Sequence, residues 1–403
     1  MADAMLAAAD ELAVDPVARE LGIDPVEVDE LLSAGYTLPA ELYTDPRVAK
    51  LEDRWIWQRT WTFAGLVQDL REPGDYLTTK VGSVPVVAVC NKEGELRAFV
   101  NVCRHRGFTP AEGSGNRKSI QCRYHGWVYD LNGCLRSVPR AAEVDDFAEF
   151  GLVPAHVDTW AGMVFVSVNP RESLAESLGE LPALHKAAGY LPVFELYDDW
   201  VQDGDLIHEE FRANWKIVME NALECYHCPT AHTHSFAELF NVDPEGYTFH
   251  NFDRGMYHLA NYTAEFAKSQ SLDVRDKHPT VETADLRIWF AWPTLQGVLA
   301  EGSADATQTF VAHVIPLAHD RCLYQFMSYK RKGAESTDPM GPPGTSEILQ
   351  QTFDEDVALC ERIQEGLASG MVRVGKTVAE SETNIRHFQR LTWDALAPAF
   401  GVR

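Results

Sequence analysis

Two cysteine–histidine pairs constrain this chain more than any other feature of its sequence. Cys103 and His105 are spaced as Cys-x-His, Cys122 and His125 are spaced as Cys-x-x-His, and sixteen residues lie between the pairs. The surrounding sequence predicts short strands and turns, so each pair is expected on its own loop. Two such loops that meet around bound metal leave the chain little freedom in how it folds there.

Two kinds of metal site use two cysteines and two histidines. Zinc accepts this ligand set, but the common zinc finger has both cysteines in one half of the motif and both histidines in the other. A Rieske [2Fe–2S] centre needs two cysteines on one iron and two histidines on the other. Because each loop supplies one cysteine and one histidine, two adjacent loops can hold such a cluster across both irons. The pattern therefore favours iron–sulfur over zinc.

A second group of possible metal ligands lies in the stretch 214–234. Glu224, His227 and His232 have the spacing E-x2-H-x4-H. Two imidazoles and one carboxylate form the facial set of non-haem Fe(II) oxygenases, which leaves positions open for dioxygen and substrate. Here the carboxylate precedes both histidines. We therefore interpret Glu224 as a partner that holds the free N–H of an imidazole, and we expect the third ligand elsewhere.

This spacing alone is weak evidence for iron. A histidine in an aromatic-rich helix is more often a hydrogen-bonded core residue, and His234 competes with His232 as a ligand. A Cys-x-x-Cys pair around His227 is also typical of zinc or redox motifs. We expect the cysteines outside the two Cys–His pairs to be buried apolar thiols. They are Cys90, Cys134, Cys225, Cys228, Cys322 and Cys360.

The third iron ligand is expected on a long helix predicted over about residues 346–368. Its candidates are Asp354, Glu355 and Asp356, which helical periodicity separates. Asp356 falls on an apolar stripe, where a carboxylate is costly to bury unless it is paired or binds a metal. The alternative is an acid favoured by the helix dipole. The stripe is Phe353, Asp356, Cys360, Ile363 and Leu367, and the solvated face is Asp354, Ala358, Glu361 and Glu365.

Length and composition indicate a globular protein of two domains. The chain has 403 residues, of which 45% are apolar and 24% charged. The formal net charge of −25 argues against nucleic acid or an anionic membrane as partner, since both bind clustered cations. The N-terminus lacks the features of a signal peptide, and no run approaches the ~20 apolar residues of a membrane span. We therefore expect a cytoplasmic enzyme whose eight cysteines are thiols or metal ligands.

Changes in periodicity predict three regions. Residues 1–42 form an N-terminal helical arm, with a helix over 16–32 and then a turn. Residues 43–170 form a small β domain that holds both Cys–His pairs, after a helix over about 46–61. Residues 171–403 begin with a linker and one helix up to about residue 200. Further expectations are strands at 75–81, 84–90, 96–102, 161–168, 206–211, 247–249, 287–292 and 308–315, a hairpin turn at 131–133 and a loop at 331–345.

The segments CRH, CRYHGWVYDLNG, NWK and ENALECYHCPTAH together resemble the large (α) subunit of Rieske non-haem iron oxygenases. The resemblance extends from about residue 37 to the C-terminus. It implies an α+β chain, in which an all-β Rieske [2Fe–2S] domain precedes a helix-grip catalytic domain with a curved antiparallel sheet. The family spacing prefers His232 over His234. The implied cluster ligands are Cys103, His105, Cys122 and His125, and the implied ligands of the mononuclear iron are His227, His232 and Asp356.

Glu224 corresponds to the bridging carboxylate of this family, which is Asp in most members. Glu is the form found in the subgroup that acts on quaternary ammonium compounds such as carnitine and betaines. In the family, the electron crosses between subunits of a ring-shaped trimer, so the resemblance implies that His125 meets Glu224 of the neighbour. Glu224 and Asn221 are the predicted catalytic residues.

The resemblance also implies the cofactors and partners. The cofactors are the Rieske [2Fe–2S] cluster and mononuclear Fe(II), and the assembly is a homotrimer. Because the chain lacks a nucleotide-binding fingerprint, a flavin and iron–sulfur reductase or a ferredoxin must supply electrons. Residues 101–140 carry an excess of five positive charges. They are a candidate docking face for an acidic donor, although loop arginines also stabilise the negative charge of a cluster.

The substrate is the property that the sequence determines least. Glu224 favours a small quaternary ammonium or related amine, which is hydroxylated or N-demethylated. An aromatic cage would be the physical partner of such a cation, although aromatic strand residues are more often core. Three alternatives remain: an aromatic-ring hydroxylase, a Rieske electron carrier with an iron-free ligand-binding domain, and a zinc-stabilised binding module. The candidate substrate-binding residues are Tyr257, Tyr262, Trp289 and Trp292.

Overall fold

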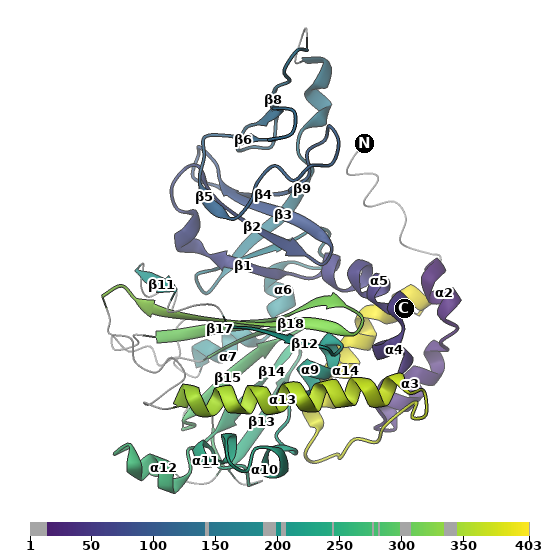
Figure 1. Cartoon of the computed structure of the whole chain (residues 1–403), viewed down its shortest axis with the longest axis vertical. Helices are drawn as coiled ribbons and strands as arrows, with labels where there is room; N and C mark the ends of the chain where they lie inside the picture. Colours follow the sequence, from purple (N-terminus) through teal and green to yellow (C-terminus); the bar gives the residue numbers. More distant parts are fainter. Residues whose placement is uncertain are drawn as a thin grey trace. The chain divides into compact units, whose positions relative to one another are not determined.

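The computed structural model describes residues 14–141, 145–187, 199–202, 207–243, 246–275, 278–280, 283–298, 308–333 and 345–402. Within these ranges the chain forms two compact units (Figure 1). The first unit is residues 52–177, and the second is residues 14–51, 178–187 and 199–402. Most of the predicted loop at 331–345 and the end of the predicted 171–200 linker lie outside the described residues.

The first unit consists mainly of antiparallel strands. Its larger sheet has the order β1-β10-β9-β4-β3-β2-β5, and a smaller sheet has the order β6-β7-β8. The strands are β1 (Thr62–Leu66), β2 (Asp75–Val81), β3 (Val84–Cys90), β4 (Leu96–Val100), β5 (Ser114–Asn116), β6 (Ile120–Gln121), β7 (Val128–Tyr129), β8 (Leu135–Ser137), β9 (Pro154–Trp160) and β10 (Met163–Ser167). Short 3-10 helices are η1 (Trp57–Arg59), η2 (Val67–Leu70) and η3 (Asp145–Phe150).

Strand β3 lies inside the larger sheet, and its apolar sequence VPVVAVC explains why. Its last five residues are all buried, as expected for a strand covered on both faces. Val87 and Val89 belong to the core cluster that contains Cys103 and Cys122. Their neighbour Val86 belongs to a second cluster on the other side of the sheet. One face of the larger sheet therefore packs directly against both cysteines.

The smaller sheet contains the hairpin that the sequence predicts at 131–133. The predicted turn is confirmed, because it joins β7 to β8. Gly133 has a φ of 79°, and a Cβ at this position would overlap the ring of Phe99. Only glycine satisfies both the backbone angle and the close approach.

The second unit is an eight-stranded antiparallel sheet with helices packed against it (Figure 1). The strand order is β11-β18-β17-β16-β15-β14-β13, and β12 also pairs with β18. The strands are β11 (Trp200–Gln202), β12 (Ile207–Phe211), β13 (Tyr247–Phe252), β14 (Gly255–Ala260), β15 (Leu286–Ala291), β16 (Leu295–Val298), β17 (Gln308–Ala318) and β18 (Arg321–Arg331).

Most helices of the protein belong to this second unit or to its borders. The N-terminal helices are α2 (Pro16–Leu21), α3 (Pro25–Ser33), α4 (Glu41–Thr44) and α5 (Pro46–Trp55), and the middle ones are α6 (Leu174–Leu178), α7 (Leu181–Ala187), α9 (Trp215–Ala222), α10 (Cys228–Ala231), α11 (Phe236–Leu239) and α12 (Ala264–Ser269). The C-terminal helices are α13 (Thr345–Ala368), α14 (Thr383–Leu396) and the 3-10 helix η4 (Ala397–Phe400). None of the described helices is long and apolar enough to cross a membrane.

The strand register divides the large sheet of the second unit into two faces. His258, Gln296 and Tyr324 lie on one face, which we call the inner face. Helices cover this face: Gln296 Nε2 lies 3.8 Å from Met219 Sδ on α9, and the Tyr324 ring lies 5.3 Å from that of Phe353 on α13. The helix-grip arrangement expected from the sequence is therefore present.

The N-terminal arm belongs to the second unit up to residue 51, so the predicted boundary between 42 and 43 is displaced. Tyr43 explains this, because its Oη donates a hydrogen bond of 2.7 Å to Glu220 on α9. Gln389 on α14 donates to both groups, at 3.1 Å to Tyr43 Oη and 3.0 Å to Glu220. Burial raises the pKa of Glu220 to about 7. The other boundary lies after residue 177 and not after residue 170.

Several predicted helices differ from those observed. The helix predicted over 16–32 is two helices, because Gly22 ends α2 in a left-handed conformation and Asp24 caps α3. The predicted turn that follows contains α4, and α5 ends at Trp55 before η1. The linker contains two short helices, α6 and α7, where one was expected. Such short elements carry too little periodicity to be recognised in the sequence.

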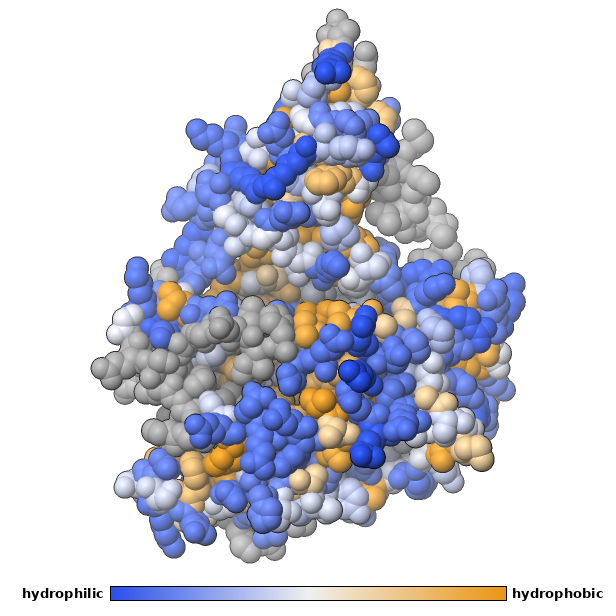
Figure 2. All heavy atoms as spheres, in the orientation of Figure 1, coloured by the Kyte–Doolittle hydropathy of each residue, from blue (hydrophilic) through white to orange (hydrophobic). Residues whose placement is uncertain are grey.

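The long helix near the C-terminus is confirmed as α13, but its buried side differs from the predicted stripe. Thr352, Cys360 and Gln364 are buried, whereas Ile363 is 47% exposed. Asp354 is exposed as predicted. The buried residues of α13 thus follow a spacing of four residues, and Asp356 lies at one position of this spacing. Figure 2 shows mainly hydrophilic side chains on the visible surface over this helix.

We expect Tyr43→Phe to destabilise the second unit. The change removes the hydroxyl that joins Glu220 to Gln389 and leaves buried polar groups without a partner, which costs about 1–3 kcal/mol of the free energy of unfolding. Urea unfolding followed by tryptophan fluorescence measures this. The control is Tyr36→Phe on the exposed Tyr36. Equal stability of both variants and the parent would contradict the role given to this network.

Candidate active site

Helix α9 and the turn after it position the first two residues of the site. The side chain of Asn214 caps this helix by accepting a hydrogen bond from the backbone N–H of Lys216 at 3.0 Å. The backbone N–H of Asn214 donates to Gln364 on α13 at 2.8 Å. The two helices are therefore fixed to each other where α9 begins. The turn at the end of α9 carries Glu224 and His227, and the short helix α10 leads to His232.

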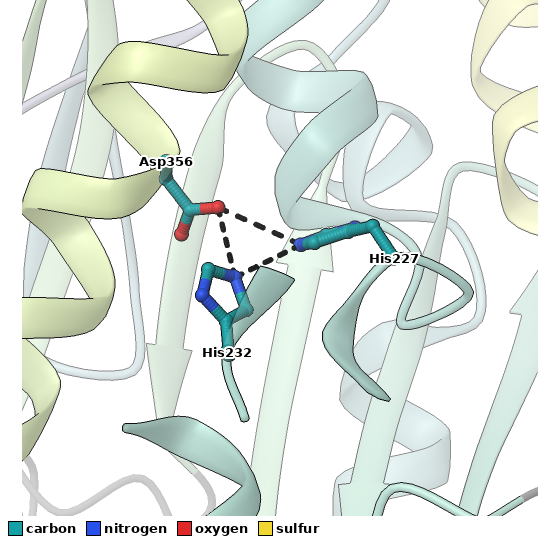
Figure 3. Close-up of side chains that lie close together, drawn as sticks. All are labelled: His227, His232 and Asp356. Carbon is teal, nitrogen blue, oxygen red and sulfur yellow. Dashed lines mark hydrogen bonds and ion pairs between the residues drawn. The ribbon is translucent and has the colours of Figure 1, made fainter. Parts of the chain in front are cut away.

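Three potential ligand atoms converge in front of α13 (Figure 3). His227 Nε2 and His232 Nε2 lie 3.1 Å apart. Asp356 Oδ1 lies 3.1 Å from His232 Nε2 and 3.5 Å from His227 Nε2. Among the described residues, this is the group of His, Cys, Asp and Glu side chains whose ligand atoms all lie within 4.8 Å. The structure thus brings together the three residues that the sequence predicts as iron ligands.

A carboxylate contacts the outer nitrogen of each histidine. Glu224 Oε1 forms a short contact with His227 Nδ1, and Glu224 also accepts from the backbone N–H groups of Tyr226 and His227. Glu355 Oε2 lies 2.8 Å from His232 Nδ1. Because an ionised carboxylate only accepts hydrogen bonds, both Nδ1 atoms carry the proton. Both Nε2 lone pairs are then directed toward Asp356 Oδ1.

This arrangement fits a metal cation. Two imidazole lone pairs and a carboxylate oxygen face one another, which is unfavourable unless a positive charge lies between them. Burial lowers the pKa of His227, but Asp356 and Glu224 outweigh burial and raise the pKa to about 9. The same balance of burial and carboxylates raises the pKa of His232. The donor set is the two-histidine, one-carboxylate facial set of non-haem Fe(II).

Asn221 and Glu355 complete the surroundings of Asp356 and His232. Asn221 Nδ2 donates a hydrogen bond of 3.0 Å to Asp356 Oδ1, so this predicted catalytic residue contacts the carboxylate that is predicted to be a ligand. Burial raises the pKa of Glu355, but hydrogen bonds from Ser235, His232 and Gln351 outweigh burial and lower it. The sequence offered Glu355 only as a candidate ligand, and its contact with His232 was missed. The sequence signal that could have indicated this contact was the position of Glu355 directly before Asp356 on a predicted helix.

The two Cys–His pairs lie on loops of matching backbone geometry in the first unit. Cys103 N–H donates to Phe108 O at 2.7 Å and Gly107 N–H donates to Cys103 O at 3.0 Å. In the other loop, Cys122 N–H donates to the carbonyl five residues on at 2.8 Å, and Gly126 N–H donates back to Cys122 O at 2.9 Å. Both glycines adopt a φ near 78°, where a side chain would be strained. The two loops therefore have the same backbone conformation, although the spacing between cysteine and histidine differs between them.

The burial of these residues separates cysteines from histidines. Cys103 and Cys122 are almost completely buried, whereas His105 and His125 are exposed, with ring centroids 4.5 Å apart. Trp127 stacks on His105 at 4.9 Å. This arrangement suits a binuclear cluster with one iron inside the unit and the other at its surface. Zinc would instead require all four ligands to meet at one point.

Two family models match the chain. The model described as "Rieske [2Fe-2S] domain" matches residues 60–148, and the model described as "Ring hydroxylating alpha subunit (catalytic domain)" matches residues 197–397. The chloroplastic choline monooxygenase of Spinacia oleracea is 30% identical over 88% of this chain and 76% of the relative. The chain belongs to the α subunits of the Rieske non-haem iron oxygenases.

Two further comparisons agree with this membership. The carnitine monooxygenase oxygenase subunit of Acinetobacter baumannii is 29% identical over 88% of this chain and 94% of the relative. A solved structure is that of a quaternary ammonium Rieske monooxygenase, whose description refers to inter-subunit electron transfer. It matches with a TM-score of 0.74 and 25% identity over 93% of this chain and 98% of that one.

Membership in the Rieske oxygenases settles several expectations. The predicted fold class, a Rieske domain joined to an α+β catalytic domain, is confirmed. The chain is the oxygenase component of a system in which a partner reductase supplies electrons. Its cofactors are a Rieske [2Fe–2S] cluster and a mononuclear iron. The zinc module and the iron-free electron carrier are thereby excluded.

Two of the four predicted cage residues of this Rieske oxygenase lie on the sheet face opposite to the inner face. Tyr257 and Trp289 lie on the face opposite to the inner face, where their rings lie 6.1 and 5.9 Å from that of His185 on α7. Tyr262 stacks on Phe240 at 5.1 Å. The indole N–H of Trp292 donates to Thr392 Oγ at 3.3 Å. A strand alternates its faces, and the sequence did not show which face lies toward the triad.

The inner face offers other residues near the predicted iron ligands, which the sequence did not single out. Burial and, to a smaller extent, the proximity of His227 lower the pKa of His258 to about 4, so this imidazole is neutral. Tyr324 Oη donates to Gln296 Oε1 at 2.9 Å. Burial and the nearby Asp356 both raise the pKa of Tyr324. The register of the sheet was the signal required to find these residues, and it follows only from the fold.

The cysteine prediction is wrong at three positions. Cys225 and Cys228 form a disulfide across the turn that carries His227, where buried free thiols were expected. Cys134 is exposed. Cys90, Cys322 and Cys360 are buried free thiols as predicted. The pairing follows from the turn between α9 and α10, which brings the two sulfur atoms together.

We expect Asp356→Ala to remove the mononuclear iron and abolish oxygenase activity, because two histidines alone hold Fe(II) weakly. The Rieske absorption spectrum should stay unchanged. Iron analysis per chain, together with this spectrum, measures both effects. Asp354→Ala, at an exposed neighbouring position, should retain iron and activity. Full iron content in Asp356→Ala would move the ligand to another residue.

Proposed function

We propose that this oxygenase subunit uses dioxygen to hydroxylate or N-demethylate a small quaternary ammonium compound or related amine. The main support is the similarity to relatives named carnitine and choline monooxygenases, each over 88% of this chain, and to a glycine betaine monooxygenase over 52% of it. The glutamate at position 224 agrees with this subgroup, because Glu224 occupies the bridging position where most of the family has Asp.

The charge around the iron triad also favours a cationic substrate. Asp356, Glu224 and Glu355 surround this site, and three carboxylates exceed the charge of one Fe(II) ion by one. An excess negative charge in a partly buried site attracts a cation more strongly than the same charge in water. A neutral aromatic substrate would gain nothing from it.

In this proposal, His227, His232 and Asp356 hold the mononuclear iron, which supplies dioxygen activation when bound. Asn221 orients Asp356 through its 3.0 Å hydrogen bond. In the first unit, Cys103 and Cys122 hold the buried iron of the cluster. His105 and His125 hold the exposed iron, so electrons enter or leave through the histidine side.

The exposed histidine pair suits electron transfer to another subunit. We propose that His125 of one subunit contacts Glu224 of its neighbour in a homotrimer, and that Glu224 conducts the electron toward His227. Glu224 already contacts His227 within the chain. The description of the similar quaternary ammonium monooxygenase as showing inter-subunit electron transfer supports this route. The electron donor is a flavin and iron–sulfur reductase or a ferredoxin, attracted by the positive charges of residues 101–140.

The substrate class is tested by oxygen uptake with the reduced holoenzyme. Carnitine, glycine betaine and choline should stimulate oxygen consumption with formation of an oxidised or demethylated product, because each presents a quaternary ammonium group to the anionic site. Benzoate and other simple aromatics should give only the background rate. The Asp356→Ala protein measures uptake that does not depend on the mononuclear iron. Turnover of an aromatic compound and of no ammonium compound would establish the ring-hydroxylase alternative instead.

The bridging role of Glu224 is tested by Glu224→Gln. The variant should keep both metal sites and be reduced normally. We expect reoxidation of its Rieske centre by substrate and oxygen to be about 10- to 100-fold slower, as for loss of a carboxylate that supports a ligating histidine. Rapid mixing measures this, because the colour of the Rieske centre reports its redox state.

The matched control is Glu238→Gln, since Glu238 is an exposed glutamate on α11. It should be reoxidised at the rate of the parent protein. An unchanged rate in Glu224→Gln would rule out the bridge and leave the oxygenase assignment intact.

A further inference from the structure

Glu355 is held in place by three side chains. Its Oε2 accepts hydrogen bonds from His232 Nδ1 at 2.8 Å and from Ser235 Oγ at 2.5 Å. Its Oε1 accepts from Gln351 Nε2, one turn earlier on α13, at 2.9 Å. A carboxylate with both oxygens occupied has a fixed orientation, unlike an acid in a solvated ion pair.

One helix therefore contacts both nitrogens of the same imidazole. Glu355 contacts Nδ1 of His232, and the next residue, Asp356, lies 3.1 Å from its Nε2. Consecutive residues on a helix point about 100° apart, so their carboxylates can reach opposite edges of one ring. This explains why two acids follow each other at this point of α13. Asp356 reaches the point where the ligand atoms converge, and Glu355 reaches the Nδ1 side of His232.

The two histidines are then oriented in different ways. His227 is held by Glu224, which lies on its own turn three residues earlier. His232 is held by a residue more than a hundred positions away, on the helix that also supplies the ligand carboxylate. The position of His232 relative to Asp356 is thus fixed by α13 itself. A shift of the turn that carries His227 leaves that relation unchanged.

We propose that Glu355 is the positioning residue of the mononuclear iron site: it fixes the tautomer and the ring orientation of His232 through Nδ1, so that Nε2 and the Asp356 carboxylate face the metal together. Ser235 and Gln351 in turn hold the Glu355 carboxylate. The proposal rests on the assignment of His232 and Asp356 as iron ligands. A carboxylate behind a ligating histidine raises the basicity of the ligand and its affinity for metal.

Metal titration of the apo site in the full-length protein tests the proposal without any substrate. Fe(II), added anaerobically, and Co(II), whose visible bands report ligand geometry, are the probes. Glu355→Gln retains the shape and the ability to accept from Nδ1 but loses the charge, and we expect about 10-fold weaker binding. Glu355→Ala loses the contact, and we expect about 100-fold weaker binding with altered Co(II) bands. Glu355→Asp, one methylene shorter, should not restore the parent affinity.

Two controls separate positioning from general damage to the fold. Asp354→Asn changes the exposed acid on the preceding residue of α13 and should leave metal affinity and Co(II) bands unchanged. Ser235→Ala leaves every charge in place and removes one of the three hydrogen bonds that hold Glu355, so it should change the Co(II) bands in the direction of Glu355→Ala. The Rieske spectrum reports whether each variant folds.

The outcomes distinguish this proposal from the assignment on which it rests. Loss of metal in Asp356→Ala, combined with parental affinity and parental Co(II) bands in Glu355→Ala, would overturn the role of Glu355 alone. Retention of metal in Asp356→Ala would overturn the ligand assignment and this proposal with it. Failure of carnitine, betaine and choline as substrates would affect neither result.

Discussion

The catalytic unit depends on one electrostatic constraint: three acceptor atoms must be held facing one another. Left to themselves, His227 Nε2, His232 Nε2 and Asp356 Oδ1 would repel and turn away. The surrounding residues prevent this, because each histidine is held from behind by a glutamate. The resulting site has a strong preference for a small cation. The raised pKa of both histidines has the same cause, because the nearby carboxylates also favour a bound proton.

The rest of the second unit can be understood as support for this arrangement. The three predicted ligands come from a turn and from a long helix that are distant in the sequence, so the two must be fixed to each other. Asn214 joins the start of α9 to Gln364 on α13. Tyr43 and Gln389 fix the opposite side of α9 through Glu220. The N-terminal arm therefore folds with the catalytic unit, although it precedes the Rieske unit in the chain.

The first unit, which binds the cluster, uses the same backbone arrangement in both of its Cys–His loops. Both loops close with the same pair of backbone hydrogen bonds, and a glycine with positive φ follows each cysteine after four residues. The cysteines are fixed in the core by this geometry. His105 lies two residues after its cysteine, and His125 lies three residues after its own. Both histidines are exposed. In the proposed electron route, electrons therefore enter and leave on the histidine side of the cluster.

The sequence by itself determined the family and the cofactors, and it predicted candidate residues to hold them. Cysteine and histidine spacing identified the cluster loops, and helical periodicity distinguished Asp356 from Asp354. Strands β2 and β3 were predicted with the correct bounds, because each is enriched in β-branched residues and is bounded by turn residues. These features are local, so neighbours in the sequence suffice to reveal them.

Only the tertiary structure decided which residues meet across the fold. The contact of Glu355 with His232 joins residues more than a hundred positions apart, and no local pattern contains it. The side of the sheet that faces the three predicted ligands could not be recognised either, because alternation in a strand gives two faces without showing which one is which. For this reason Tyr257 and Trp289 were expected near the substrate, whereas the register places Tyr324 and its neighbours on the inner face. Long-range pairing, and not the composition of any segment, fixed the surroundings of the iron site.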